Sequence, residues 1–390
     1  MTAVASWLEL SEKAWATNVQ VFRELAGPQR KLGAVLKGNA YGHGFTTVLP
    51  WAHASTDALY VITPQEAQGI RAWESFTNAP RKPVLVIGPA SSAEAVDLAK
   101  SDVDLVAADA GFAQHVAALR AAKPGKKLRT QVHIDTGLGR EGFTVEQLGK
   151  GEADFLAQSA DVLELCGALS HFSNTEDVTE QSYAQQQLDA FDKGVALLEA
   201  RAGLPKGAPR HMAASAAALV LPPARLDILR AGIALYGQWP STETRLSARV
   251  VLSRVPTLAP VLSWRCPSQV VKWLPAGSYV GYGNTYRCGA PTRVAVLPVG
   301  YYDGYPRLAS GKAHVLVNGK RCPLLGRVMM NHLIADVTHA VTDERPLTAT
   351  LLGSDGDETI TADALAGWAQ TIHYEVLTRL GSHLERRTVS

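Results

Sequence analysis

The sequence lacks the features of a membrane or nucleic-acid-binding protein. No apolar run reaches about 18 residues without a charge or a proline, so no membrane-spanning helix is predicted. Lys and Arg form no dense run and the formal net charge is only +2, which argues against nucleic acid or an acidic membrane as a partner. The first ten residues show no basic region followed by an apolar core, so we expect no signal peptide and a cytoplasmic location.

Cysteine is scarce, and two motifs are missing. The four cysteines are far apart and form no CxxC pair, which argues against a zinc site, and in a chain this long we expect reduced, buried thiols. No GxGxxG opens a helix after a strand, so the dinucleotide-binding signature is absent. What is present is an ordinary globular composition over 390 residues, which favours two domains.

The first 240 residues alternate short β-rich runs with longer helical stretches. This alternation predicts parallel strands joined by helices, and eight such units fit a (β/α)8 barrel of the TIM type. A doubly wound open sheet is the alternative, which periodicity does not exclude. The predicted strands are Leu32–Leu36, Ala58–Ile62, Pro83–Ile87, Asp104–Ala108, Gln131–Asp135, Glu164–Ser170, Pro209–Met212 and Leu226–Tyr236. The predicted helices are Trp15–Leu25, Pro64–Trp73, Ala93–Lys100, Ala110–Ala121, Thr144–Gln158, Glu180–Ala202 and Ser215–Leu221.

The pattern changes after about Gln238. Short apolar runs then alternate with turn signals, which predicts a mainly antiparallel β domain over residues 241–390, after a barrel domain over residues 1–240. One helix is expected within it, at Thr361–Gln370. The predicted strands are Ala248–Ser253, Pro260–Trp264, Arg293–Pro298, Ala313–Val317, Leu333–Val337 and Ala349–Leu352.

A lysine stands where barrel enzymes carry their reactive groups, at the carboxyl end of a strand. Lys37 follows the first predicted strand directly, within the segment VLKGNAYGHG at residues 35–44. Burial there would lower its pKa and free the amine for Schiff-base chemistry. A lone lysine at a strand end would be read as an ordinary one, but the glycine-rich context changes that reading.

This segment resembles the cofactor-lysine signature of alanine racemases, which are fold type III pyridoxal 5'-phosphate (PLP) enzymes. Further matches follow in order to the C-terminus, so the resemblance covers nearly the whole chain. It implies that Lys37 binds PLP covalently and acts as one of two acid–base groups at the substrate α-carbon. It also implies that Tyr41 binds the cofactor phosphate.

Two strand ends resemble further segments of the family. VHIDTGLGREGF at residues 132–143 implies that Arg140 lies near the cofactor ring hydroxyl and the substrate carboxylate, since its planar fork matches a carboxylate. The alternative is a salt bridge from Arg140 to Glu141. LSHFSN at residues 169–174 implies that His171 lies beneath the cofactor ring, as a supporting residue.

The last two barrel segments, at residues 210–216 and 228–237, extend the resemblance. Ser215 would bind the phosphate, although helix N-capping is its alternative role. The backbone N–H groups of Gly232 and Ile233 would reach the phosphate too. His211 would hydrogen-bond Arg230, which would face the pyridine nitrogen. Because an arginine stays protonated, it cannot protonate that nitrogen, which favours reprotonation at the α-carbon over transamination.

The β domain supplies the remaining matches. VGYGNTY at residues 280–286 resembles the segment that holds the second catalytic base, a tyrosine from the partner subunit, although a lone Tyr282 would be read as a hairpin aromatic. Racemisation needs one group on each face of the α-carbon, so Lys37 and Tyr282 would work as a pair in a two-fold homodimer. By the same resemblance Tyr301 and Arg307 line the substrate access channel. The Met330 N–H binds the substrate carboxylate and Tyr374 lies near the phosphate.

Three positions depart from the family pattern. His133 stands where many members carry a carbamylated lysine, so another group must orient Arg140. Asn331 replaces an aspartate, and Ala214 replaces an asparagine. The first two changes alter the charge around the substrate carboxylate, and Asn331 brings the chain closer to broad-specificity racemases.

The resemblance implies a racemase of small amino acids, with alanine as the first candidate and D-alanine for peptidoglycan as its role. A broad-specificity racemase is the first alternative. A basic amino-acid decarboxylase shares the architecture but usually presents an acid to the ring nitrogen, in place of Arg230. A non-catalytic PLP-binding protein is typically the barrel alone. A degenerate paralogue that binds PLP but turns over poorly is the last alternative.

Overall fold

The computed structural model describes residues 6–176 and 181–389, which form two compact units. The barrel unit comprises Ala16–Lys37 and Leu49–Leu258. The β unit comprises Met1–Trp15, Gly38–Val48 and Ala259–Ser390. The chain therefore passes from one unit to the other directly after Lys37.

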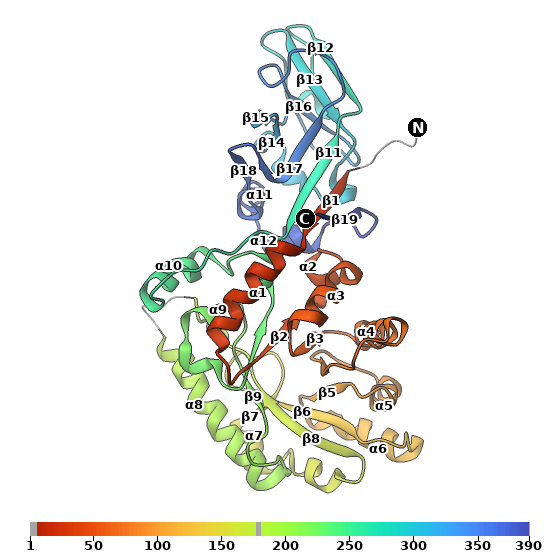
Figure 1. Cartoon of the computed structure of the whole chain (residues 1–390), viewed down its shortest axis with the longest axis vertical. Coiled ribbons are helices and arrows are strands. Elements are labelled where there is room, and N and C mark those ends of the chain that lie inside the picture. The colour runs from red at the N-terminus through yellow and green to blue at the C-terminus, as the bar shows by residue number, and fades with distance from the viewer. Residues whose placement is uncertain (1–5, 177–180, 390) are drawn as a thin grey trace. The chain divides into compact units, whose positions relative to one another are not determined.

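Eight parallel strands form the core of the barrel unit (Figure 1). They are β2 (Lys31–Val35), β3 (Ala58–Val61), β4 (Val84–Val86), β5 (Asp104–Ala107), β6 (Leu128–Asp135), β8 (Leu163–Leu169), β9 (Arg210–His211) and β10 (Ile228–Ala231). Their order is β10-β2-β3-β4-β5-β6-β8-β9, and the two-residue β7 (Phe143–Thr144) pairs with β6. Two backbone hydrogen bonds link the terminal strands, from Asp227 N–H to Arg210 O (3.1 Å) and from Arg230 N–H to Ala213 O (2.9 Å). The sheet is therefore a nearly closed TIM-like barrel, which confirms the predicted fold class over the open-sheet alternative.

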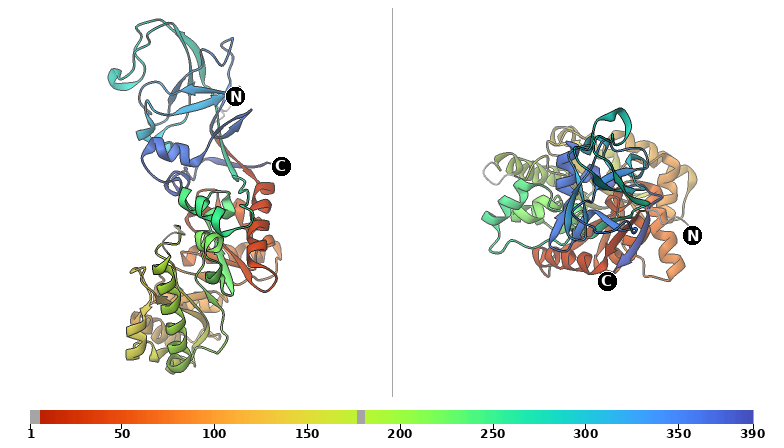
Figure 2. Two further views of the ribbon diagram at one scale, coloured as in Figure 1. Left: turned by 90° about the vertical axis from the view of Figure 1, so that its left-hand side faces the viewer. Right: turned by 90° about the horizontal axis from the view of Figure 1, so that it is seen from above.

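Helices surround these strands on the outside of the barrel (Figures 1 and 2). Several begin with a capping box; in α4, for example, the Thr63 side chain accepts from Glu66 N–H while the Glu66 carboxylate accepts from the Thr63 backbone. The predicted start of one helix, Glu180, lies outside the described residues. The helices that include residues of this unit are α1 (Glu12–Ala26), α3 (Phe45–Ser55), α4 (Pro64–Thr77), α5 (Ser92–Lys100), α6 (Ala113–Ala122), α7 (Val145–Lys150), α8 (Ser182–Leu197), α9 (Ser215–Val220) and α10 (Thr242–Val251).

Three predicted elements of this region need correction. The predicted strand Ala248–Ser253 is wrong because these residues continue α10, which Ser241 caps by accepting from Thr244 N–H (3.0 Å). The predicted strand Leu226–Tyr236 ends at Ala231, and its last part is the 3₁₀ helix η5 (Ile233–Tyr236). The predicted helix Thr144–Gln158 is broken at Gly151, whose φ of 85° lies in the left-handed region.

The β unit contains two sheets and is mainly antiparallel, as predicted. The larger sheet has the order β15-β14-β17-β11-β1-β19, with β18 paired to β17, and the smaller one has the order β12-β13-β16. The N-terminal strand β1, which the sequence analysis did not predict, pairs antiparallel with β11 and parallel with β19. The predicted helix near residue 361 is confirmed as α11 (Ala362–Ala369), with Thr361 as its N-cap.

The β unit is built from short strands and short helical segments. The strands are β1 (Trp7–Ser11), β11 (Leu262–Pro267), β12 (Val270–Leu274), β13 (Thr292–Leu297), β14 (His314–Val317), β15 (Lys320–Pro323), β16 (Leu333–Asp336), β17 (Thr348–Asp355), β18 (Glu358–Ile360) and β19 (Glu385–Val389). The helical segments are α2 (Lys37–Tyr41), which starts in the barrel unit, η6 (Tyr282–Asn284), η7 (Tyr301–Asp303), η8 (Arg307–Ala309), α11 and α12 (His373–Thr378).

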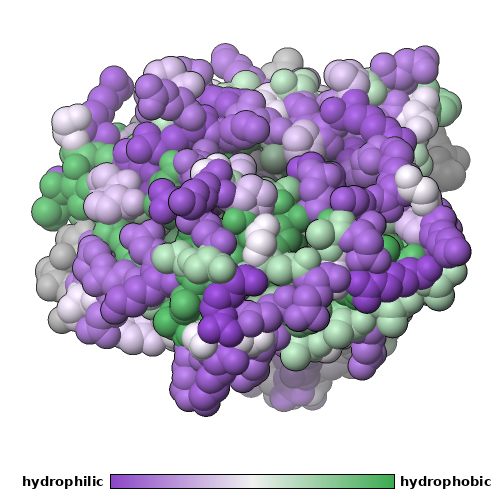
Figure 3. Space-filling model, turned by 90° about the horizontal axis from the view of Figure 1, so that it is seen from below, coloured by the Kyte–Doolittle hydropathy of each residue, from purple (hydrophilic) through white to green (hydrophobic). Residues whose placement is uncertain are grey.

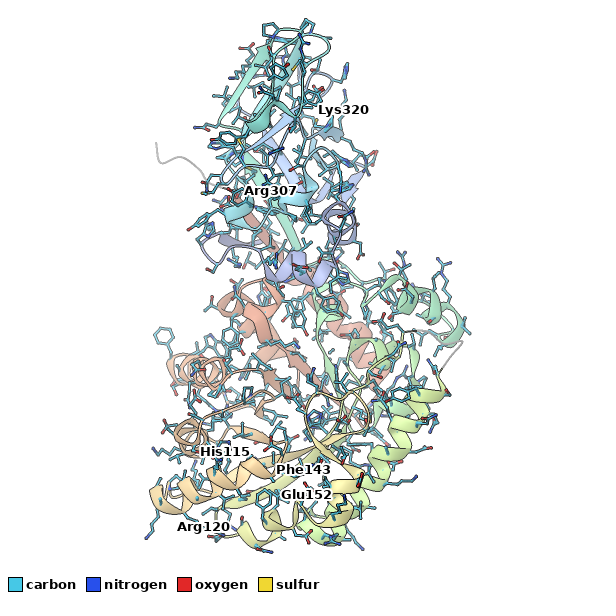
Figure 4. The ribbon with its side chains drawn as sticks, turned by 180° about the vertical axis from the view of Figure 1, so that it is seen from behind. His115, Arg120, Phe143, Glu152, Arg307 and Lys320 are labelled. Atoms are coloured by element: carbon cyan, nitrogen blue, oxygen red, sulfur yellow. The ribbon has the colours of Figure 1, made fainter. Side chains whose placement is uncertain are left out.

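Polar residues cover much of the surface. Figure 3 shows one face on which hydrophilic residues predominate and hydrophobic residues appear as patches between them. Arg120 on α6, labelled in Figure 4, pairs with Asp161 (2.8 Å) in this outer layer. In the part of the chain that the structure describes, no helix is both long and apolar enough to cross a bilayer, and no three His, Cys, Asp or Glu side chains are grouped to hold a metal ion.

A glycine makes room for a buried tyrosine inside the barrel. Tyr60 on β3 is almost fully buried, and its ring packs edge-on against His211 with the ring centroids 5.8 Å apart. A Cβ atom on Gly33 of β2 would lie only 2.1 Å from Tyr60 Cε2. The barrel interior therefore requires glycine at this position.

We predict that Gly33→Ala lowers the free energy of unfolding by about 1–3 kcal/mol, because the buried ring must move. Gly149→Ala is the matched control, since a Cβ atom at Gly149 in α7 meets no atom within 4 Å. Thermal unfolding of both variants checks this. Equal stability of the two variants would contradict the packing argument.

Candidate active site

Lys37 lies at the carboxyl end of β2, directly after the buried Leu36. Burial is the main cause that lowers the pKa of its amine, and the positive charges of Arg140 and Arg230 lower it further, while the negative charges of Glu141 and Glu66 act in the opposite direction. The two arginines come from elements far away in the sequence, so the barrel brings three cationic groups to one end of its strands. A lysine amine in such surroundings is available as a nucleophile and as a base.

The residues after Lys37 form a left-handed turn at the start of a β-unit segment. Gly38, Asn39, Ala40, Tyr41 and Gly42 all have φ between 52° and 81°. For residues with a side chain this conformation costs about 1–2 kcal/mol each, so the surroundings must hold it. The β unit does so through the Gly42 carbonyl, which accepts from Arg386 Nη2 (2.9 Å).

Arg140 is held by the residue next to it. Its Nε and Nη2 atoms donate to Glu141 Oε1 at 3.1 and 2.9 Å, which is the salt bridge that the sequence analysis kept as the alternative role of Arg140. His133, at the position of the carbamylated lysine, places its buried Nδ1 3.8 Å from the same carboxylate oxygen. Among the described residues Glu141 is thus the acid that orients Arg140.

Arg230 on β10 is a buried cation surrounded by neutral acceptors. Its Nη1 donates to His211 Nδ1 (2.6 Å) and to the His211 carbonyl (2.7 Å), so the expected contact between these two residues is present. Its Nη2 donates to the carbonyls of Ser170 (2.6 Å) and Met212 (3.1 Å) and lies 3.5 Å from His171 Nδ1. No carboxylate of the described residues pairs with it, and burial lowers its pKa to about 10.

Three neutral histidines accompany this arginine. Burial first, and then the charges of Arg230 and Arg140, lower the pKa of His171 to about 3 and that of His133 to about 4. Burial and the charge of Arg230 also hold the pKa of His211 well below its usual value. These rings therefore remain uncharged at neutral pH, and the positive charge of Arg230 stays without a counter-ion.

Ser215 is the first residue of α9 and not the residue that caps it. The N-cap of α9 is Ala214, so the N-cap interpretation of Ser215 is wrong. The Ser215 Oγ instead accepts from the backbone N–H of Gly232 (3.0 Å) and Ala234 (3.4 Å). Ile233, the other predicted phosphate ligand, begins η5 directly after Gly232. The hydroxyl and these amides therefore form one polar cluster beyond β10.

The other predicted site residues lie in the β unit. The rings of Tyr41 and Tyr374 lie 6.3 Å apart. Tyr301 N–H donates to the Met329 carbonyl (3.0 Å), which places it beside Met330. Tyr301 and Arg307 also line one open cavity of about 700 Å³; Figure 4 labels Arg307.

Tyr282 lies in the β unit and is strongly exposed. It starts the 3₁₀ helix η6 after Gly281, whose φ of 73° is left-handed. The tyrosine side chain is 73% exposed, so little of this unit covers it. Its phenol is accessible to a group outside the unit.

Comparisons with known proteins agree over the whole chain. The model of the alanine racemase N-terminal domain matches residues 10–240, and that of the alanine racemase C-terminal domain matches residues 261–388. The chain is 36% identical to the alanine racemase of Leptospira interrogans serovar copenhageni over 99% of this chain and 96% of that protein. The alanine racemase of Methylacidiphilum infernorum is 35% identical over 98% and 92% of the two chains.

Solved structures give the same result. The alanine racemase of Streptomyces lavendulae superposes with a TM-score of 0.88 at 31% identity, covering 100% of this chain and 98% of that one. The Bacillus anthracis alanine racemase, solved with bound L-Ala-P, gives a TM-score of 0.88 at 30% identity over 100% and 96%. The chain belongs to the alanine racemase family.

The family is one of isomerases. Two buried polar residues near His211, Gln131 and Asp104, were not among the predicted site residues. Gln131 on β6 accepts from His211 Nε2 at 2.7 Å, and its own amide donates to Asp104 Oδ2 at 2.9 Å. A polar residue in the middle of a strand two positions before His133 is the signal that could have shown it, since residues two apart share one face of a strand.

The neutral histidines predict a loss of stability in acid. Their pKa values are lowered in the folded state, so below about pH 6.5 the unfolded chain binds more protons and stability falls as the pH decreases toward about 4. Each such histidine contributes about 1.4 kcal/mol per pH unit in this window. We expect His133→Gln to reduce this slope in cofactor-free protein followed by thermal unfolding. His339→Gln, at an exposed histidine, is the control, and an unchanged slope in His133→Gln would contradict a neutral His133.

The left-handed turn predicts sensitivity at Gly42. A Cβ atom there would lie 1.8 Å from the Leu377 carbonyl oxygen, in addition to the strain of its φ of 81°. We expect Gly42→Ala to displace Tyr41 and to weaken binding of PLP, the cofactor that the family resemblance implies, at least about tenfold, measured by fluorescence titration. Gly27→Ala is the matched control, because Gly27 also has a positive φ (67°) but a Cβ atom there would meet no atom within 4 Å. Equal affinities would show that the turn does not govern the cofactor.

Proposed function

We propose that this chain is a PLP-dependent racemase that interconverts L- and D-alanine. One observation carries the proposal: a lysine of lowered pKa lies at the carboxyl ends of the barrel strands, near a buried arginine bonded only to neutral acceptors. The names of the relatives, all alanine racemases, supply alanine as the substrate to test first.

The residues of the barrel unit fit PLP. An arginine can only donate, so Arg230 suits an unprotonated ring nitrogen as an acceptor. Arg140 suits the anionic ring oxygen, and the cluster of Ser215 and the Gly232 N–H suits a phosphate. Tyr41 and Tyr374, whose rings lie close together in the β unit, would each offer a hydroxyl to a phosphate. When bound, PLP would supply a carbonyl for attachment to Lys37 and delocalise negative charge from the α-carbon.

The chain's own groups would move the proton. Lys37 Nζ would take or deliver the α-proton on one face, and the hydroxyl of the partner subunit's Tyr282 would do so on the other. Arg140 and the Met330 N–H would hold the substrate carboxylate, and this fixes the α-carbon between the two groups. Because Arg230 would not protonate the ring nitrogen, the bound ring would draw less negative charge from the α-carbon, which would favour return of a proton to that carbon.

Exposure of the β-unit residues supports a homodimer with shared sites. Tyr282, Tyr301 and Met330 are 73%, 42% and 55% exposed, although all three are apolar or aromatic. A second copy of the chain that supplies Tyr282 to each site would cover them, as expected for an isologous two-fold interface. The access channel would then be lined by Tyr301 and Arg307.

The residues at which the chain departs from the family pattern bear on its substrate range. Asn331 and His133 both remove charge that many members place around the substrate carboxylate. A broad-specificity racemase is therefore the second candidate. For the first candidate, D-alanine supply for peptidoglycan is the proposed role.

The test is chiral chromatography of L-alanine, L-serine, L-lysine and L-arginine incubated separately with the protein and PLP. We expect D-alanine to form fastest. Lys37→Ala and Tyr282→Phe should each lower kcat at least about 100-fold, because each removes an acid–base group. Lys31→Ala at the exposed start of β2 and Tyr279→Phe at another exposed tyrosine are the matched controls.

Two outcomes would change the assignment. Comparable turnover of several substrates would make the chain a broad-specificity racemase. No D-product from any substrate, despite PLP binding, would contradict racemisation altogether.

A further inference from the structure

A chain of buried hydrogen bonds runs from Arg230 into the barrel interior. Arg230 Nη1 contacts His211 Nδ1 (2.6 Å), His211 Nε2 contacts Gln131 Oε1 (2.7 Å), and Gln131 Nε2 contacts Asp104 Oδ2 (2.9 Å). His211 is fully buried, and the other three residues are at most 9% exposed. We call Arg230, His211, Gln131 and Asp104 the relay. Its far end is anchored by Arg129, whose Nε donates to Asp104 Oδ1 (2.9 Å).

The two ends of the relay fix the direction of every bond in it. The guanidinium of Arg230 has only donors, so the hydrogen bond between them is kept only while His211 Nδ1 carries no proton. The proton of the neutral ring then lies on Nε2, which donates to the Gln131 oxygen. The Gln131 amide nitrogen is left to face Asp104, whose carboxylate can only accept. Each group has one role, and reversing any single bond would bring two donors or two acceptors together.

We propose that Gln131 and Asp104 are positioning residues that hold His211 in its Nε2–H tautomer, so that Arg230 stays directed at the cofactor ring. The part that concerns the cofactor rests on the proposed function. Without the relay, His211 could carry its proton on Nδ1, where it would face the N–H of Arg230. Of the side chains that the structure describes, His211 alone accepts from this arginine at a distance below 3 Å, and that contact would then be lost.

The barrel is built to admit this relay. Gln131 and His133 lie two residues apart on β6 and share one face of the strand. A Cβ atom on Gly167 of β8 would lie 3.2 Å from Gln131 Oε1 and 3.0 Å from the Pro209 carbonyl, so glycine leaves the space that the amide needs. Burial makes each of these bonds costly to leave unmade.

The test begins with the cofactor-free protein. In protein labelled with ¹⁵N-histidine, the His211 signals among those of the 11 histidines are assigned by their loss in His211→Gln. We expect a protonated Nε2 and an unprotonated Nδ1 in the wild type. Gln131→Met removes the acceptor, and Asp104→Asn changes no atom that contacts His211, yet both should give a mixture of tautomers.

A buried glutamine outside the relay provides the control. Gln187 on α8 is fully buried and donates to Thr136 Oγ1 and the His171 carbonyl. Gln187→Met should lower stability by a similar amount and leave the His211 tautomer unchanged. This separates tautomer control from a general effect of losing a buried amide.

The second readout is cofactor affinity and kinetics. Gln131→Met and Asp104→Asn should weaken PLP binding about tenfold, which corresponds to about 1.4 kcal/mol. With PLP saturating, kcat for alanine should fall more than KM rises, because the substrate carboxylate contacts are not altered.

The results separate the inference from the proposed function. A wild-type tautomer in both relay variants would overturn the relay, and an altered tautomer with unchanged PLP affinity and kcat would overturn its positioning role. A wild-type protein that binds no PLP would instead contradict the proposed function, and the directing of Arg230 at a cofactor would fall with it. The tautomer of the cofactor-free protein would still decide whether the relay exists.

Discussion

The arrangement of the site depends on one buried charge. Arg230 lies inside the barrel with a histidine nitrogen and three carbonyl oxygens as its hydrogen-bond partners. Burying an unpaired cation is unfavourable, so the fold must supply several aligned dipoles to hold it. Burial and the charge of Arg230 together lower the pKa values of the surrounding histidines, so these rings stay neutral and can act as such dipoles.

The same charge determines what the site can bind. A cation without a counter-ion attracts a neutral or anionic acceptor, and Arg140 and Lys37 add two more donors nearby. A carboxylate in place of Arg230 would neutralise this field and restore the pKa of Lys37 toward its usual value. The family's chemistry, as proposed for this chain, therefore depends on keeping acids away from β10.

Much of the fold followed from the sequence because strand ends and helix caps are local signals. Periodicity predicted all eight barrel strands. Lys37 follows a buried strand directly, and burial at that position is the main cause of its lowered pKa. The strand β1 escaped notice because its partners, β11 and β19, lie more than 250 residues away. The short apolar run in helix α10 predicts a strand, and Ser241 as an N-cap is the local signal that favours the helix instead.

The site was less accessible to sequence reasoning. Family resemblance indicated Lys37, Arg140 and Arg230, whereas the salt bridge from Arg140 to Glu141 was expected only as an alternative, and the structure contains it. The position of Gln131 two residues before His133 is a signal in the sequence, but its contacts with His211 and Asp104 could not be predicted because these residues come from different strands and carry no motif. The left-handed turn was not predicted, although Gly38, Asn39 and Gly42 are residue types that tolerate a positive φ; the positive φ of Ala40 has no such local signal and depends on the surrounding fold.

The most direct test of this account concerns the charge at Arg230. In Arg230→Glu the carboxylate would stabilise a protonated ring nitrogen of PLP, and the ring would then draw negative charge away from the α-carbon. The ratio of pyruvate to D-alanine formed from L-alanine should then rise at least about tenfold over the wild type. An unchanged ratio, in a variant that still binds PLP and forms D-alanine, would contradict the claim that this buried cation restricts the site to racemisation.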